Sequence, residues 1–145
     1  METQNIFQRL VAGAFLGVGA LIVPTPVAAA DITVELNKFE QNEGGGCRAF
    51  FLFENRMDQT MEGFEMSLAI LDKSGVIDRL LSIDAAPLPA GRTTLKLFEI
   101  PEIRCDNISE ILLHDMTSCK PQNSEEMDCF PIMDIVSRAP AKLVK

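Results

Sequence analysis

The chain has 145 residues, a length that fits one domain, and its 21 acidic and 13 basic side chains give a net charge of −8. An acidic surface of this kind repels nucleic acid phosphates and anionic lipid headgroups, so we discount nucleic acid and membrane surfaces as partners. Trp and Tyr are absent, and nine Phe residues supply the aromatic volume of the core.

The N-terminus has the three-part layout of a secretory signal peptide. Arg9 supplies a positive charge, residues 10–23 form an unbroken apolar run, and small residues end at Ala30. The run is shorter than the roughly 20 residues that span a bilayer, which favours cleavage over a retained membrane anchor. The sequence therefore predicts a signal-peptide helix over residues 1–30, cut after Ala30, and a mature periplasmic protein with no membrane attachment.

Strand patterns follow one another through the mature chain. Apolar and polar residues alternate with period 2 in most of them, and the Phe-rich run RAFFLF at 48–53 predicts a central strand buried on both faces. Residues 108–117 also fit a short helix, but a strand is favoured. The expected strands are residues 31–37, 48–53, 64–70, 76–83, 92–98, 108–117 and 130–138.

The number and spacing of these strands predict the fold class. Seven short strands without a long helical pattern are typical of an all-β, antiparallel β-sandwich with immunoglobulin-like topology. We expect this sandwich to be a single domain over residues 31–138. Residues 139–145 are small and basic, and we expect them to form a flexible tail.

Four cysteines, Cys47, Cys105, Cys119 and Cys129, lie in the mature region. An even number in a small exported domain indicates two disulfides, and CxxC-like metal spacings are absent from the sequence. In an immunoglobulin-like topology the second and fifth strands are antiparallel neighbours, which brings Cys47 to Cys105. The last two strands are consecutive and should form a hairpin, stapled by Cys119–Cys129.

The motif His114-Asp115-Met116 has the clearest chemical character in the chain. An imidazole and a thioether one residue apart on a strand point to the same face, and soft sulfur suits Cu(I). The pair resembles part of the site of periplasmic copper chaperones, which are small exported β-sandwiches. Those proteins need a second histidine upstream, and His114 is the one histidine of this sequence. An ordinary strand pair, with Met filling the core, is the competing interpretation.

Methionines and a phenylalanine cluster in two predicted connections. Met57, Met61 and Phe64 follow the second strand, and Met127 lies between the last two strands. In an immunoglobulin-like sandwich these two connections share one end. The four side chains are therefore either an adaptable protein-binding tip or a cap on the core.

Several segments together resemble a group of known sequences. They are CRAFFLFEN at 47–55, LDKSG at 71–75, LPAGRT at 88–93 and the stretch between Cys105 and Cys119. This combination is similar to uncharacterised exported immunoglobulin-like proteins of alphaproteobacteria, often named Tat pathway signal sequence domain proteins. The resemblance implies a periplasmic protein of unassigned function and supplies no catalytic residues. Gln8-Arg9 stands where a twin arginine would be expected.

The functional prediction follows from the absence of catalytic motifs in the sequence. A lone histidine disfavours a hydrolase, because the nucleophile needs a neighbouring base. We therefore expect a periplasmic, non-enzymatic accessory domain without a cofactor that binds another envelope protein, through loops or through open strand edges. A copper carrier centred on His114 and Met116 is the alternative. The oligomeric state stays open.

Overall fold

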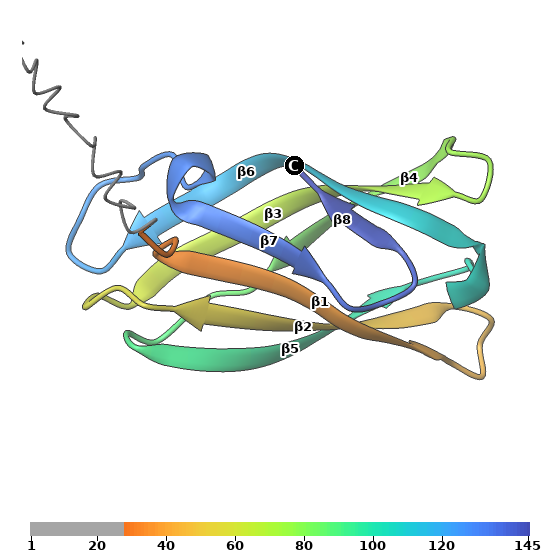
Figure 1. Cartoon of the computed structure of the whole chain (residues 1–145), viewed down its shortest axis with the longest axis horizontal. Helices are drawn as coiled ribbons and strands as arrows, with labels where there is room; N and C mark the ends of the chain where they lie inside the picture. The colour runs from red at the N-terminus through yellow and green to blue at the C-terminus, as the bar shows by residue number, and fades with distance from the viewer. Residues whose placement is uncertain (1–27) are drawn as a thin grey trace, which may run out of the picture.

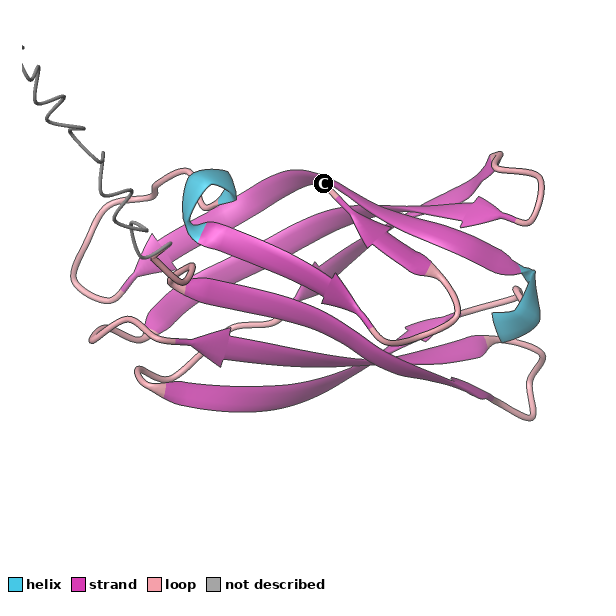
Figure 2. Cartoon of the chain, in the orientation of Figure 1, coloured by secondary structure: helices cyan, strands magenta, loops and turns pink. Residues whose placement is uncertain are grey.

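The computed structural model describes residues 28–145, so nearly all of the expected signal peptide lies outside the described residues. Eight strands and two short 3₁₀ turns make up this part of the chain (Figures 1 and 2). In residues 28–145 no helix is long and apolar enough to span a membrane. The elements are β1 (Ile32–Gln41), β2 (Cys47–Asn55), β3 (Met61–Asp72), β4 (Ile77–Asp84), β5 (Arg92–Ile100), η1 (Cys105–Asn107), β6 (Ile108–Pro121), η2 (Phe130–Ile132), β7 (Met133–Ser137) and β8 (Lys142–Val144).

The strands form two four-stranded sheets that pack face to face, so the all-β prediction is confirmed. One sheet has the order β5-β2-β1-β7 and the other β4-β3-β6-β8 (Figure 1). The expectation of a wholly antiparallel sandwich is wrong, because β7 runs parallel to β1 and β8 runs parallel to β6. The chain crosses from one sheet to the other between β6 and β7, and crosses back before β8. These crossings place both final strands beside parallel neighbours.

Buried and outward-facing residues alternate along β1 and β2 of the first sheet. In β1, Ile32, Val34 and Leu36 are fully buried while the residues between them face outward. Strand β2 shows the same period, with every second residue buried. Its outward residues Phe50 and Leu52 are half exposed, so the predicted burial of this strand on both faces is wrong. On that outer face the Lys38 ammonium lies over the Phe50 ring, 4.3 Å from its centroid.

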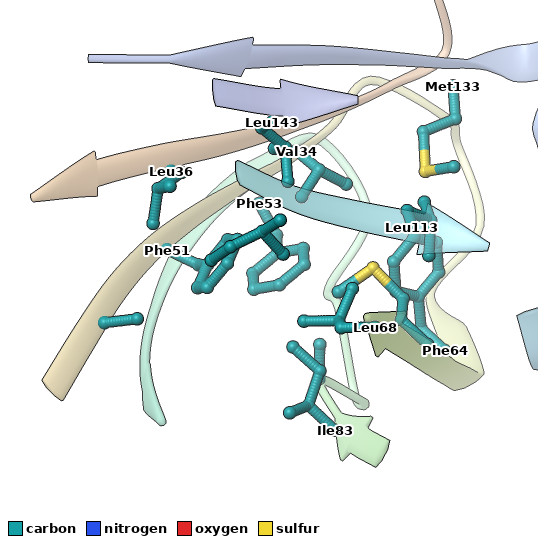
Figure 3. Packing of buried hydrophobic residues seen from close by; sticks show 14 of the residues in the cluster. Val34, Leu36, Phe51, Phe53, Phe64, Leu68, Ile83, Leu113, Met133 and Leu143 are labelled. Carbon is teal, nitrogen blue, oxygen red and sulfur yellow. The ribbon is translucent and has the colours of Figure 1, made fainter. Parts of the chain in front are cut away.

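The core lies between the two sheets and is dominated by phenylalanine. Phe53 of β2 and Phe64 of β3 meet edge to face across the interface, with ring centroids 5.9 Å apart (Figure 3). Phe51 lies beside Phe53 on the same strand at 6.0 Å. Full burial of one such ring contributes about 1.5–3 kcal/mol, so this trio is a main source of contact between the sheets.

Both expected disulfides are confirmed, although the Cys119–Cys129 bond connects different structural elements from those predicted. Cys47 opposes Ile100 where β2 pairs with β5, and the chain then turns so that Cys105 lies 4.9 Å from Cys47 between Cα atoms. Cys119 and Cys129 are 5.9 Å apart. The predicted hairpin of the last two strands is wrong, because β6 and β7 belong to different sheets. The Cys119–Cys129 bond therefore ties the end of β6 to the segment that enters the opposite sheet.

The expected flexible tail is also wrong. Residues 142–144 form β8, and Leu143 is only 9% exposed opposite Ile111 of β6. Ser137 Oγ donates a hydrogen bond of 2.6 Å to the carbonyl of Ala141, and the Lys145 ammonium donates to main-chain carbonyls that flank η2. The last residues are ordered because Leu143 completes the core at the end of the β4-β3-β6-β8 sheet.

Candidate functional site

His114 and Met116 lie on opposite faces of β6. His114 Nε2 is 2.8 Å from Ser67 Oγ on the outer face of the sheet, whereas Met116 pairs with the buried Met66 and packs against the core. The pairing of β3 with β6 shifts register here, because a bulge inserts one extra residue at His114. The expected common face is therefore wrong. Within residues 28–145, no three His, Cys, Asp or Glu side chains lie close enough to bind one metal ion.

The methionines of the first predicted loop cap the core. Met61 and Phe64 are both 0% exposed, and Met57 packs against the same cluster. Met61 exchanges two main-chain hydrogen bonds with Leu88, at 2.9 and 3.0 Å, which holds its side chain inward at the start of β3. The protein-binding tip predicted for these residues is wrong, and the core-capping alternative is confirmed.

The two connections do meet at one end of the sandwich, as expected. The Gln122 amide donates a hydrogen bond of 2.8 Å to the carbonyl of Thr60, which joins the β2–β3 and β6–β7 connections. Met127 is 40% exposed and is the member of the predicted tip that stays accessible. One methionine is too small a surface to carry binding alone.

The outer edges of β4 and β5 are protected against pairing. Each strand points one cation into the space between the sheets: Lys96 lies opposite Phe51, and Arg79 lies opposite Ile70. Lys96 Nζ donates at 3.4 Å to the carbonyl of Ala86, and the Arg79 guanidinium donates to that of Pro101. An inward charge on an edge strand opposes the addition of another strand, since the new strand would bury it. The faces of the sheets are therefore better candidates for binding than the edges at β4 and β5.

A continuous apolar row crosses the outer face of the β4-β3-β6-β8 sheet. Leu80 lies opposite Ala69, Ala69 opposite Leu112, and Leu112 opposite Val144, so all four strands contribute. Leu80 is 63% exposed, whereas Ala69 is 2% exposed because Leu80 and Leu112 flank it. The outer face of a sheet in contact with water normally carries polar residues, so this row is a candidate interaction surface.

A second pair of apolar side chains extends the row toward the β3–β4 turn. Leu71 lies opposite Ile77, and Ile77 is 57% exposed. This surface was not predicted, although the sequence carries a signal of it. Residues 68–71 and 111–113 are apolar without alternation, a pattern typical of a strand covered on both faces.

The half of this face beyond the apolar row is acidic. Glu65 and Asp84 lie opposite each other on β3 and β4, and Asp115 lies opposite Ser67. Glu65 accepts a hydrogen bond of 2.7 Å from Ser82 Oγ, and each aspartate accepts one of 2.9 Å from a main-chain amide. Within residues 28–145 none of the three carboxylates forms a salt bridge. We call the row with Ile77, Leu71 and these carboxylates the apolar–acidic face.

Comparison with known proteins supports the fold alone. No family model matches the chain, and no curated protein is similar to it. The solved structure of IrmA from Escherichia coli is similar, with a TM-score of 0.56 over 73% of this chain and 91% of that chain. The identity of 14% is low, so the likeness concerns the arrangement of the strands and says nothing of a shared activity.

Proposed function

We propose that this protein is an exported, non-enzymatic accessory domain that binds another envelope protein through the apolar–acidic face. The observation that carries the proposal is the apolar row from Leu80 to Val144 beside three carboxylates without cationic partners. Exposed apolar patches of this kind mark protein interaction sites, and buried apolar area supplies the affinity. The two disulfides support a place outside the reducing cytoplasm.

The chemistry of the face defines the partner. Its segment needs aliphatic or aromatic side chains to cover Leu80 and Leu112, and Lys or Arg side chains to meet Glu65, Asp84 and Asp115. Such a segment gains affinity from the apolar contact, while the charges favour its orientation and speed its association. The partner element is therefore basic and amphipathic.

The immunoglobulin-like assignment is part of this proposal. Three strands of one sheet, β1, β2 and β5, correspond in order to the A, B and E strands of that fold, and β3 pairs with β6 as C pairs with F. The position of β7 beside β1 departs from the constant-type pattern. The resemblance to exported alphaproteobacterial proteins of unassigned function stays a prediction.

Two synthetic peptides of equal length test the proposal, one of alternating Leu and Lys and the other of alternating Leu and Glu. We expect the basic peptide to shift backbone amide resonances around Leu80, Leu112 and Asp115, and the acidic peptide to leave them unchanged. Binding should weaken strongly as salt rises from about 0.05 to 0.5 M, because exposed charges are screened.

A matched pair of variants locates the binding. Leu80→Glu should abolish the shifts, while Leu95→Glu, which changes an equally exposed leucine on the other sheet, should leave them intact. A photo-crosslinker at position 80 in producing cells should then give an adduct with an envelope protein that carries a basic amphipathic segment. Equal binding of both peptides, or binding insensitive to Leu80→Glu, contradicts the proposal.

A further inference from the structure

The outer face of the β5-β2-β1-β7 sheet carries a second apolar patch. Leu52 lies opposite Leu95 and Phe50 lies opposite Leu97, so four large side chains form a compact group on two paired strands. Leu95 and Leu97 are 52% and 49% exposed, and Phe50 and Leu52 are half buried. This patch lies on the side of the sandwich away from the apolar–acidic face.

The charges around this patch are arranged in a different way from those of the apolar–acidic face. Here the charged side chains are paired with one another within the face. The pairs comprise four basic and four acidic side chains, so their net charge is 4 − 4 = 0. The Arg48 guanidinium, 2.6 Å from Glu99, lowers the pKa of that carboxyl below its ordinary value. Asp134 adds one carboxylate at the margin on β7, so the face as a whole carries a net charge of 4 − 5 = −1. We call this outer face the neutral face because its paired charges cancel. The pairs are Lys38–Glu40, Arg48–Glu40, Arg48–Glu99, Arg56–Glu54 and Arg138–Glu35.

We propose that a second copy of this chain docks on this neutral face, sheet against sheet. The chain has a net charge of −8, so two copies repel each other at most approaches. Docking through the apolar–acidic face would bring together two sets of Glu65, Asp84 and Asp115. The neutral face presents Phe50, Leu52, Leu95 and Leu97 among ion pairs that cancel, with Asp134 as one extra carboxylate at its margin. It is therefore where a copy approaches with the least repulsion.

The layout of the neutral face suits a two-fold contact. Stable interfaces have an apolar centre and a polar rim, and a two-fold axis makes the same patch serve both copies. The four apolar side chains form the centre, where the Lys38 ammonium lies 4.3 Å from the centroid of the Phe50 ring. Ion pairs such as Arg48–Glu99 and Arg56–Glu54 border this centre. Because the rim charges are already paired within each copy, the contact requires no new ion pair.

This inference is independent of the proposed function, because the two surfaces lie on opposite sheets. A dimer joined through the neutral face leaves the apolar–acidic face of each copy exposed on the outside. Such a dimer presents two identical binding faces, and two linked sites on one partner assembly bind more tightly than either alone.

Sedimentation velocity of the protein, purified from the oxidising periplasm of an expression host, tests the proposal between about 1 μM and 1 mM. We expect a monomer–dimer equilibrium that shifts toward the dimer as salt rises, because salt screens the repulsion between two copies of net charge −8. Leu95→Glu should weaken the dimer by at least about tenfold, because it places a carboxylate in the apolar centre. The matched control Leu80→Glu, on the opposite sheet, should leave the dimer unchanged.

The variant Leu52→Lys distinguishes a dimer that forms through the outer face of the sheet from one that forms by pairing of β5 edges. Leu52 is on β2, between β1 and β5, and lies opposite Glu35, so the new lysine has a carboxylate neighbour in the monomer and does not alter the β5 edge. We expect it to weaken the dimer as Leu95→Glu does, with an unchanged melting temperature. A monomer at all concentrations, a dimer sensitive to Leu80→Glu, or a dimer that survives Leu52→Lys overturns the proposal.

Discussion

Asn55 and Leu88 are joined by a hydrogen bond of 2.9 Å from the side-chain amide of the first to the main-chain carbonyl of the second. The same amide donates at 2.9 Å to the carbonyl of Gln59, and Asn55 Oδ1 accepts at 3.0 Å from the Met57 amide. Asn55 is 1% exposed, and no buried side-chain polar atom in residues 28–145 lacks a partner. One side chain thus fastens the β2–β3 connection to the segment that leads into β5.

Replacing this side chain should be costly for stability. Asn55→Ala removes the side-chain hydrogen bonds to Leu88, Gln59 and Met57, and the Leu88 carbonyl keeps only its bond from the Met61 amide. We therefore expect a loss of about 2–3 kcal/mol in the free energy of unfolding. Urea unfolding measures it. Asn107→Ala, which removes the same atoms at an exposed position, should change stability by less than about 0.5 kcal/mol. Equal effects of the two variants contradict a structural role for Asn55.

The two disulfides should differ in their contribution to stability. Cys47 and Cys105 are separated by 58 positions, and Cys119 and Cys129 by 10. Restriction of the unfolded chain grows with the loop that is closed, which gives about 4 kcal/mol for the first bond and about 3 kcal/mol for the second. Paired Cys→Ala variants and thermal unfolding should show this order. Equal melting temperatures of the wild type with and without reductant would mean that neither bond stabilises the fold.

Acid should weaken the fold through Glu35. The hydrogen bond from Asn37 lowers the pKa of Glu35 below its ordinary value of 4.5, against an opposing effect of burial, and Arg138 lowers it further. Because the unfolded chain binds this proton more tightly, the stabilisation is complete above about pH 4.5 and is lost as the pH falls through the lowered pKa.

Asn37→Ala tests this cause. It should raise the pKa of Glu35, as followed by NMR titration of the carboxyl carbon, and reduce the acid sensitivity of stability. Asn107→Ala serves again as the control and should leave the titration unchanged. A Glu35 midpoint that stays in place in Asn37→Ala rules out the hydrogen bond as the main cause.

The inward lysine of β5 should protect against aggregation. Lys96→Val removes the inward-facing, partly buried cation and makes the edge strand more apolar, so we expect several-fold faster aggregation, measured by light scattering at equal concentration. Lys73→Val removes the same charge in the exposed β3–β4 turn and is the matched control. Equal aggregation rates of the two variants would falsify the protective role of Lys96.

Much of the fold could be predicted because strand formation is a local property. The alternation of Ile32, Val34 and Leu36 puts one face inward whatever the neighbours are. The pairing of β2 with β5 was also predictable from topology, and it brought Cys47 and Cys105 together as expected. The crossing of β7 and β8 between sheets was not predictable, because it depends on partners that are distant in the chain.

The interaction surfaces were harder to predict for the same reason. One inserted residue in β6 turned His114 outward and Met116 inward, and such a bulge exists only relative to the partner strand. The apolar row also needs the register of four strands before Leu80 and Val144 can be recognised as parts of one surface.

By itself, the sequence determined where seven of the eight β-strands lie, which cysteines pair, and that the chain is acidic without a catalytic motif. These properties depend on local alternation, on composition and on a strand order common to many sandwiches. Only the tertiary structure decided which residues share an outer face and which charges are neutralised there. Leu80 and Leu95 are both exposed leucines, and their different settings, acidic and neutral, arise from strands that the fold places beside them.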